Sequence, residues 1–199
     1  MSTGEEKIWE TLASHTPEEV CRRSDATFDA ASGLYSLKSF GNNFNISLQE
    51  KRIFGDSPAD EALSKKLGYF FRLSILGYLA IAKDISPSGR LIKPINMTGG
   101  QLFFRGSHAL PLEKLAEKYG SDKEGFLNAG MMLGGDILQY GDASLKLLPF
   151  PMVPVTMILW LADEEFPARA DLLFDSGIEI QLPIDVIWAI AMMSVIALQ

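Results

Sequence analysis

Residues 141–183 constrain the fold more than any other part of this 199-residue chain. The stretch contains three extended apolar runs, which prolines and one acidic turn separate from each other. Apolar runs of this length, bounded by turn-forming residues, are typical of buried or half-buried β-strands. We therefore expect strands at residues 144–149, 155–162 and 171–182, the last of which ends in alternating apolar and polar side chains.

A long helix is expected before this sheet, over residues 58–83. Its second half, residues 67–82, is apolar on nearly every face apart from Arg72. A helix with this profile is buried on most sides, so we expect it at the centre of the fold. Shorter helices are expected at residues 5–14, 17–23, 111–119, 122–133 and 184–197.

The clearest hairpin lies between residues 34 and 49. Apolar and polar side chains alternate through 34–40 and 44–49, and Gly41-Asn42-Asn43 between them has the composition of a tight turn. Another strand is expected at residues 101–105. Because helices and strands are segregated along the chain, the sequence predicts an α+β fold, with a mainly antiparallel sheet, a long buried central helix and flanking helices.

The length suits one domain, which we expect to span residues 1–199. Within it, residues 1–57 would hold the N-terminal helices and the hairpin, and residues 58–199 the main core. The formal net charge of −7 disfavours nucleic acid as a partner. The acidic, polar N-terminus does not resemble a signal peptide, and no apolar run is long enough to cross a bilayer. We therefore expect a soluble, cytoplasmic protein without a transmembrane segment.

His108 is the first candidate for a functional residue. It follows Phe103-Phe104-Arg105-Gly106-Ser107, so its imidazole is flanked by aromatic rings and a guanidinium. In such a loop a histidine could be the axial ligand of a metal centre, or a general base. The alternative is a loop histidine that hydrogen-bonds to the backbone, and from the residues alone this alternative is favoured.

Arg72 is the second candidate, because it interrupts an otherwise apolar helix. An unpaired buried charge is costly, so the guanidinium must find a partner. That partner is either a carboxylate of the protein, such as one in the turn at 163–165, or an acidic group of a ligand. The sequence leaves both possibilities open.

Asp163, Glu164 and Glu165 form the third candidate, directly after a strongly apolar run. Adjacent carboxylates could bind a hard cation or raise one another's pKa for acid–base chemistry. The competing interpretation is a solvated turn, which is favoured because neighbouring strand residues point to opposite faces.

The apolar sequence of the expected terminal helix, IWAIAMMSVIAL, has almost no polar face. It is therefore buried either by the rest of the chain or by a second copy, which makes a homodimer one hypothesis. Cys21 is the only cysteine, so the chain cannot hold an iron–sulfur cluster by itself.

Several short motifs together carry a family resemblance. The Asp163-Glu164-Glu165-Phe166-Pro167 run followed by Leu173-Phe174-Asp175 is the most specific of them. The others are Gly99-Gly100, Phe103 to His108, Gly134-Gly135-Asp136, Gly141-Asp142-Ala143, Leu148-Pro149, Val153-Pro154 and Trp160. In this combination, the chain resembles the domain of unknown function 3786 family over about residues 60–190. The resemblance implies a protein of anaerobic metabolism, where corrinoid and other tetrapyrrole enzymes are common.

No complete catalytic motif is present, so a binding or accessory protein is the first hypothesis. Its ligand would be a corrinoid (cobalamin-like) or another tetrapyrrole such as haem. The chain lacks the DxHxxG signature of Rossmann-type corrinoid domains, so binding would be of another kind. The second hypothesis is the cofactor-free homodimer, and the third is an enzyme that uses the carboxylates at 163–165. The expected cofactor-binding residues are His108, Arg105, Phe104, Arg72 and Trp160, with His108 as the metal ligand.

Overall fold

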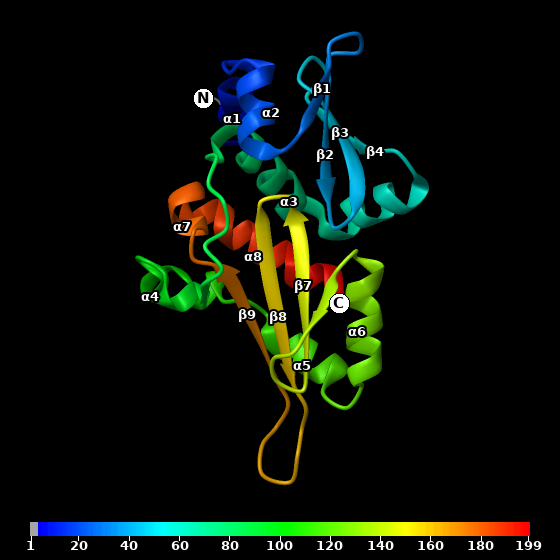
Figure 1. The fold of residues 1–199 in the computed structure, drawn as a ribbon, viewed down its shortest axis with the longest axis vertical. Coiled ribbons are helices and arrows are strands. Elements are labelled where there is room, and N and C mark those ends of the chain that lie inside the picture. The colour runs from blue at the N-terminus through cyan, green and yellow to red at the C-terminus, as the bar shows by residue number, and fades with distance from the viewer. Residues whose placement is uncertain (1–3) are drawn as a thin grey trace.

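The computed structural model describes residues 4–199, which form two antiparallel sheets with helices packed between and around them (Figure 1). This is the α+β architecture that the sequence predicts. Helix α3 (Pro58–Ile81) contacts the smaller sheet and packs along α8 (Ile184–Leu198), so the expected long central helix is confirmed.

The start and the course of α3 follow from its sequence. Ser57 caps the helix, because its hydroxyl accepts from the Asp60 backbone N–H at 3.2 Å and the Asp60 carboxylate accepts from the Ser57 N–H at 2.8 Å. Pro58 occupies the first turn, where no backbone donor is needed. Gly68, at φ +58°, breaks the helical geometry and produces a kink. Beyond Gly68 the helix is buried on most sides, as its composition requires.

The smaller sheet contains the predicted hairpin. Strands β2 (Leu34–Ser39) and β3 (Asn42–Ser47) pair across the turn at Gly41, which has φ +77°. Two short strands extend the pair, and the sequence analysis did not find them: β1 (Thr27–Asp29) pairs with β2, and β4 (Arg52–Gly55) pairs with β3.

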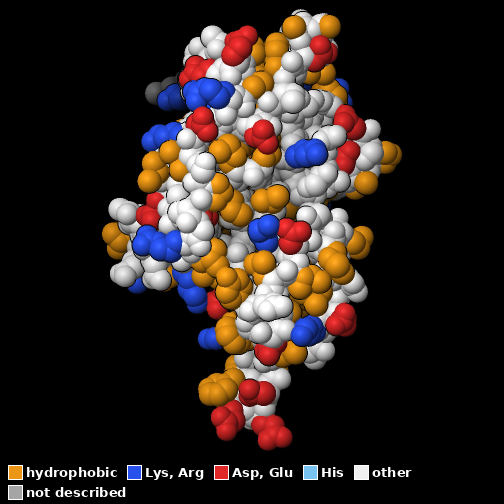
Figure 2. Space-filling model, in the orientation of Figure 1, with side chains coloured by type: hydrophobic (Ala, Val, Ile, Leu, Met, Phe, Trp, Pro, Cys, Tyr) orange, Lys and Arg blue, Asp and Glu red, His pale blue; other side chains and the backbone are white. Residues whose placement is uncertain are grey.

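The larger sheet is built from residues 91–175. Its order is β5 (Leu91–Ile92), β9 (Arg169–Asp175), β8 (Val153–Trp160), β7 (Ala143–Phe150) and β6 (Asp136–Leu138), and all neighbours are antiparallel. The loop between β8 and β9 extends away from the rest of the molecule. Figure 2 shows acidic side chains gathered at this end. Phe40 donates its backbone N–H to the Leu148 carbonyl at 2.9 Å, which joins the two sheets.

The strand expected at residues 101–105 is wrong. Residues 101–103 instead belong to the short helix α4 (Gly100–Phe103), which lies between the 3-10 helices η1 (Pro94–Asn96) and η2 (Gly106–His108). Gly99 has φ +75°, and a β-carbon on Gly100 would lie 2.1 Å from the Pro94 carbonyl oxygen. The double glycine therefore permits a tight turn into a short helix, and this turn overrides the strand tendency of the aromatic residues that follow.

The strand expected at residues 171–182 is too long, because β9 ends at Asp175 and a helical turn follows. In that turn, α7 (Ile178–Gln181), the buried side chains are Ile178 and Gln181. Their spacing of three residues is the period of a helix, whereas the alternation seen in the sequence suggests a strand. Ile180, an apolar member of that alternation, is 60 % exposed.

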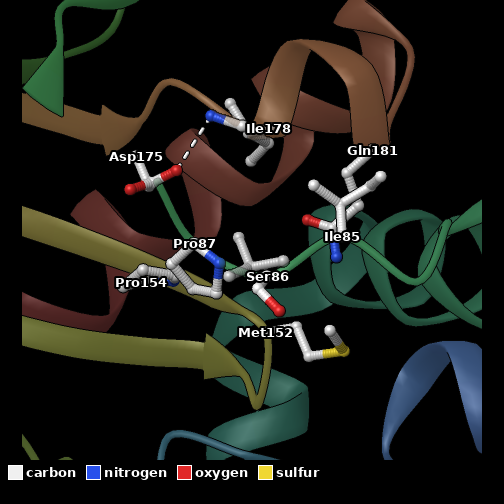
Figure 3. Close-up of a pocket in the computed structure, with 10 residues that line it drawn as sticks. Ile85, Ser86, Pro87, Met152, Pro154, Asp175, Ile178 and Gln181 are labelled. Carbon is white, nitrogen blue, oxygen red and sulfur yellow. Dashed lines mark hydrogen bonds between the residues drawn. The ribbon is translucent and has the colours of Figure 1, made fainter. Parts of the chain in front are cut away.

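The carboxylate of Asp175 explains why β9 ends there. It accepts from the backbone N–H groups of Ser88, Gly89 and Gly177 at 2.8, 2.6 and 2.8 Å. In Figure 3 it lies beside the segment that carries Ser86 and Pro87. Burial opposes its ionisation, but these donors outweigh burial and hold the pKa of Asp175 below its usual value. The carboxylate thereby fixes the chain that leaves α3 against the end of the sheet.

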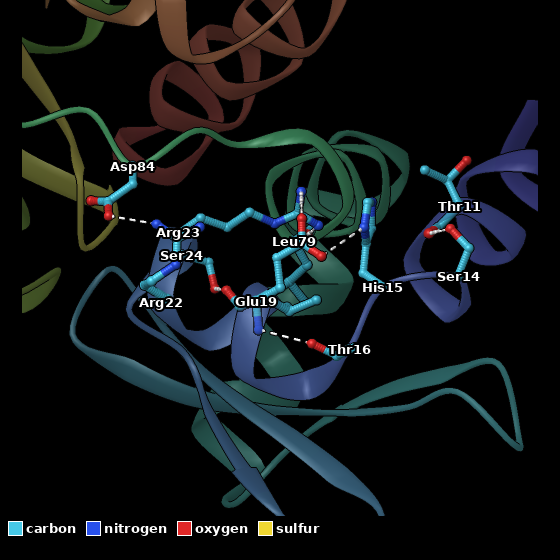
Figure 4. Close-up of polar contacts among 11 residues, drawn as sticks. Thr11, Ser14, His15, Thr16, Glu19, Arg22, Arg23, Ser24, Leu79 and Asp84 are labelled. Atoms are coloured by element: carbon cyan, nitrogen blue, oxygen red, sulfur yellow. Dashed lines mark hydrogen bonds and ion pairs between the residues drawn. The ribbon is translucent and has the colours of Figure 1, made fainter.

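The N-terminal helices dock onto α3 through polar contacts (Figure 4). Thr16 caps helix α2 (Pro17–Ser24), because its hydroxyl accepts from the Glu19 N–H at 3.3 Å. Arg23 is buried and donates to the Leu79 carbonyl at 3.1 Å, and Arg22 pairs with Asp84 at 2.9 Å. The preceding helix α1 (Gly4–Ala13) buries Trp9 and Leu12.

One continuous hydrophobic core runs from Trp9 to Leu198. Helices α5 (Leu112–Tyr119) and α6 (Lys123–Met132) pack against the larger sheet, within a residue or two of their expected bounds. Most side chains of α8 are buried by the chain's own elements. Within residues 4–199, no helix combines the length and the apolar character that a membrane crossing would require.

Candidate ligand-binding pocket

A cavity of about 780 Å³ opens between the N-terminal helix, the central helix and the terminal helix. We call it the His108 cavity. Aromatic and aliphatic side chains make up most of its wall, and two carboxylates complete it. Its lining residues are Gly4, Glu5, Ile8, Tyr69, Leu73, Leu76, Phe103, His108, Asp185 and Trp188.

The local fold carries His108 into this wall. Gly106, at φ +57°, turns the chain into η2, and His108 is the last residue of that short helix. The imidazole stacks on Phe103, with ring centroids 4.6 Å apart and an angle of 23° between the planes. Its other neighbour is Trp188, which meets it edge to face at 4.6 Å and 84°. These two contacts fix the orientation of the imidazole.

Two polar groups in this wall lack partners. Neither nitrogen of His108 forms a hydrogen bond with any residue between 4 and 199. The indole Nε1 of Trp188 is buried and has no acceptor in the same part of the chain. Buried donors are nearly always paired in folded proteins, and the indole N–H of Trp188 departs from this rule within the described residues.

The two carboxylates of the cavity differ in their surroundings. Glu5 pairs with Arg72 and also accepts from Trp9 Nε1 at 3.3 Å. The hydrogen bond from Arg72 is the main reason that the pKa of Glu5 lies below its usual value. Asp185, in the first turn of α8, accepts from the backbone N–H of Val186 at 3.0 Å and from no other donor within residues 4–199. No Lys or Arg of the described chain forms an ion pair with Asp185.

Three other residues from the sequence-based set lie near this cavity but not in its wall. Arg72 is not buried, as the helix pattern suggests, since 45 % of its side chain is exposed, and its partner is Glu5 rather than the turn at 163–165. Phe104 is buried behind Phe103 at a centroid distance of 5.6 Å. Arg105 is exposed and does not line the cavity.

Trp160 and the acidic turn lie elsewhere, around the separate β8–β9 loop (Figure 1). Trp160 lines a second cavity of about 490 Å³, where Arg169 covers its ring at 4.6 Å. Its indole N–H donates to Asp171 at 3.3 Å. The expected cofactor-binding residues therefore do not converge on one site.

The carboxylates at the tip of this loop are exposed. Asp163 accepts from the backbone N–H groups of Glu165 and Phe166 at 2.8 and 2.7 Å, which lowers its pKa and closes the turn. This is the solvated turn of the competing interpretation. No group of three or more His, Cys, Asp or Glu side chains within residues 4–199 is arranged to hold a metal ion.

Of the residues that line the His108 cavity, the sequence analysis proposed only His108 as a ligand-binding residue, and those it missed include Tyr69, Asp185 and Trp188. A signal for two of them was present, since Trp188 is the single aromatic residue of the terminal helix and Asp185 its single charge. A spacing of three residues places both on one helical face. Nothing in the sequence links that face to His108, which is 80 residues earlier.

Comparison with known protein families assigns the chain to one family. A family described as "Domain of unknown function (DUF3786)" matches residues 16–197. The chain therefore belongs to this family, and the match begins well before residue 60, the start of the resemblance found in the sequence. The N-terminal hairpin is thus part of the family domain, whereas α1 precedes it. No curated protein and no solved structure matches the chain.

Proposed function

We propose that this protein binds a small, ring-shaped molecule in the His108 cavity, as a carrier or accessory protein. The observation that carries the proposal is the imidazole of His108, which is held by Phe103 and Trp188 while its nitrogens have no partner in the described chain. The candidate ligand is a corrinoid or another tetrapyrrole such as haem. A cytoplasmic role in anaerobic metabolism is part of this proposal.

The volume and the lining of the His108 cavity support the proposed ligand binding. Pockets for small molecules usually enclose roughly 300–1,000 Å³ and are mainly apolar with a few polar groups, and the cavity of about 780 Å³ has this character. A tetrapyrrole supplies four nitrogen ligands to its own metal, so the protein needs to provide only one axial ligand. His108 would hold that axial position, and Phe103 and Trp188 would keep its ring in place.

The two other hypotheses have less support. An enzyme using the acidic turn would need Asp163 or its neighbours near His108 or Arg105, but the turn lies on the separate β8–β9 loop. The homodimer was suggested by an uncovered terminal helix, and α8 is covered by its own chain.

An absorption titration under reducing, anaerobic conditions tests the proposal. Hydroxocobalamin, cobinamide and haem are each added to the native protein, to His108→Ala and to His15→Ala. We expect a saturable one-to-one spectral shift that is lost in His108→Ala and kept in His15→Ala, whose histidine lies beside Glu19. If none of the three compounds produces a shift, the proposal is contradicted. If the shift survives in His108→Ala, the axial ligand is not His108.

A further inference from the structure

We infer that the His108 cavity selects ring ligands without carboxylates, and that Asp185 accepts a hydrogen bond from a ligand amide or ammonium group. This inference rests on the proposed function, because it concerns the same cavity. It specifies the charge of the peripheral groups of the ligand, and it names Asp185 as the residue that selects for them.

The preference for ligands without carboxylates follows from the charged side chains that line the cavity. Glu5 is neutralised by Arg72, so this pair contributes no net charge. Asp185 is exposed and has no such partner, since none of the ion pairs within residues 4–199 involves it. Among the described residues, it is therefore the one carboxylate of the lining that no Lys or Arg compensates.

The position of Asp185 lets that charge act on a bound ring. Asp185 and Trp188 are three residues apart on α8, so their side chains leave the same face of the helix. Both line the cavity, and Trp188 contacts the imidazole of His108 at 4.6 Å. A flat ligand bound through His108 would therefore have its periphery next to the carboxylate of Asp185.

Peripheral groups of different charge would respond in opposite ways. A propionate beside Asp185 would place two like charges close together, which is unfavourable. Arg72 offers little compensation, because its charge-assisted bond to Glu5 would first have to break. A primary amide, in contrast, donates N–H groups that a carboxylate accepts well. Among tetrapyrroles, the cavity thus favours a corrinoid with an amide periphery over haem with its propionates.

A matched set of ligands tests this inference. Cobinamide, haem and the dimethyl ester of haem are titrated into the native protein, Asp185→Asn and Asp163→Asn, with the absorption change as readout. We expect the native protein to bind cobinamide and the ester roughly tenfold more tightly than haem, as expected for one nearby like-charge contact. Asp185→Asn should remove most of this preference, and Asp163→Asn, on the β8–β9 loop, should keep it.

The outcomes separate the inference from the proposed function. If none of the ligands binds, the proposed function fails and the inference fails with it. If they bind but haem is as tight as its ester, or if Asp185→Asn leaves the preference unchanged, only the charge selection is overturned. Repeating the native titrations at higher salt adds a check, because the preference should shrink as the charges are screened.

Discussion

The His108 cavity and the β8–β9 loop are both rich in aromatic and charged side chains, but they use them differently. In the loop, Arg169 covers the ring of Trp160, and Asp163 accepts from the backbone of its own turn. In the cavity, His108 and the indole N–H of Trp188 have no hydrogen-bond partner within residues 4–199.

This difference identifies the better candidate for a binding site. Polar groups that already bind one another stabilise a local structure and have little left to offer a ligand. Polar groups that are held in place by packing but remain unpaired are prepared to bind one. The acidic run is the more noticeable sequence feature, yet the geometry favours the histidine. The predictions below test this contrast, from the largest expected effect to the smallest.

Replacing Gly77 by Leu should have the largest effect. A β-carbon at this position of α3 would lie 2.8 Å from a methyl group of Val186 on α8, so a larger side chain would push the two helices apart. We expect a loss of about 2 kcal/mol in the free energy of unfolding, together with weaker ligand binding. Urea denaturation measures the first effect and the absorption titration the second.

The loop provides the control for this substitution. Phe166 is 67 % exposed, so Phe166→Ala should leave both the denaturation midpoint and the ligand titration unchanged. A loss of ligand binding in Phe166→Ala would move the binding site to the β8–β9 loop.

The carboxylate of Asp175 should matter more than that of Asp163, although both accept from backbone N–H groups. Asp175 is buried, and Asp175→Asn would leave donors from Ser88, Gly89 or Gly177 poorly paired. We expect a loss of about 1 kcal/mol at neutral pH. Asp163→Asn, in an exposed turn, should not change the midpoint.

The pH dependence of Asp175→Asn follows from the direction of the pKa shift. The folded-state pKa of Asp175 lies below the unfolded value of about 3.9. Its contribution is therefore fully present well above that value and is lost as the pH falls through the folded-state pKa. Denaturation midpoints measured from neutral pH downward should show the difference between the native protein and Asp175→Asn shrinking in acid. A constant difference would contradict this assignment.

Arg72→Gln should have a smaller effect on stability. It breaks the ion pair with Glu5 that joins α1 to α3, and exposed pairs contribute about 0–1 kcal/mol. Because Arg72 lowers the pKa of Glu5, the stability that the pair provides should be lost as the pH falls below the usual glutamate range. A double-mutant cycle with Glu5→Gln isolates the contribution of the pair. A coupling energy of zero would show that packing of Trp9 and Leu12 alone holds α1.

The smallest effect is expected from removing all charge at the loop tip. The triple substitution of Asp163, Glu164 and Glu165 by Asn, Gln and Gln should leave ligand affinity unchanged, because none of the three lines the His108 cavity. A tenfold change in the absorption titration would show that the two regions are connected.

The sequence predicts most of the fold because its patterns of apolar and polar side chains extend over many residues. The central helix, the hairpin and the strands β7 and β8 each extend over six or more residues, so their periods are clear. The failures occur in short segments. Four residues at α4 and four at α7 cannot distinguish a strand from one helical turn, and tertiary contacts decide the outcome there.

The binding site was harder to predict than the fold. His108 was identified from its aromatic neighbours, but its contact with Trp188 joins segments 80 residues apart and no local pattern reveals it. Arg72 was expected to be buried because its neighbours are apolar, yet 45 % of its side chain is exposed, and it pairs with Glu5 of α1. Sequence patterns indicate which residues are unusual, whereas only the fold shows which of them meet.

The tryptophan indole resonances provide the most direct measurement of where a ligand binds. Trp9 lies in α1, Trp160 at the end of β8 beside the β8–β9 loop, and Trp188 in the wall of the His108 cavity, so the three indoles report on different parts of the molecule. The protein is labelled with ¹⁵N and titrated with cobinamide while two-dimensional spectra are recorded. We predict that the Trp188 indole signal shifts in proportion to binding and that the Trp160 signal does not move. A shift confined to Trp160, or saturation of the protein without any change at Trp188, would contradict the assignment of the site to the His108 cavity.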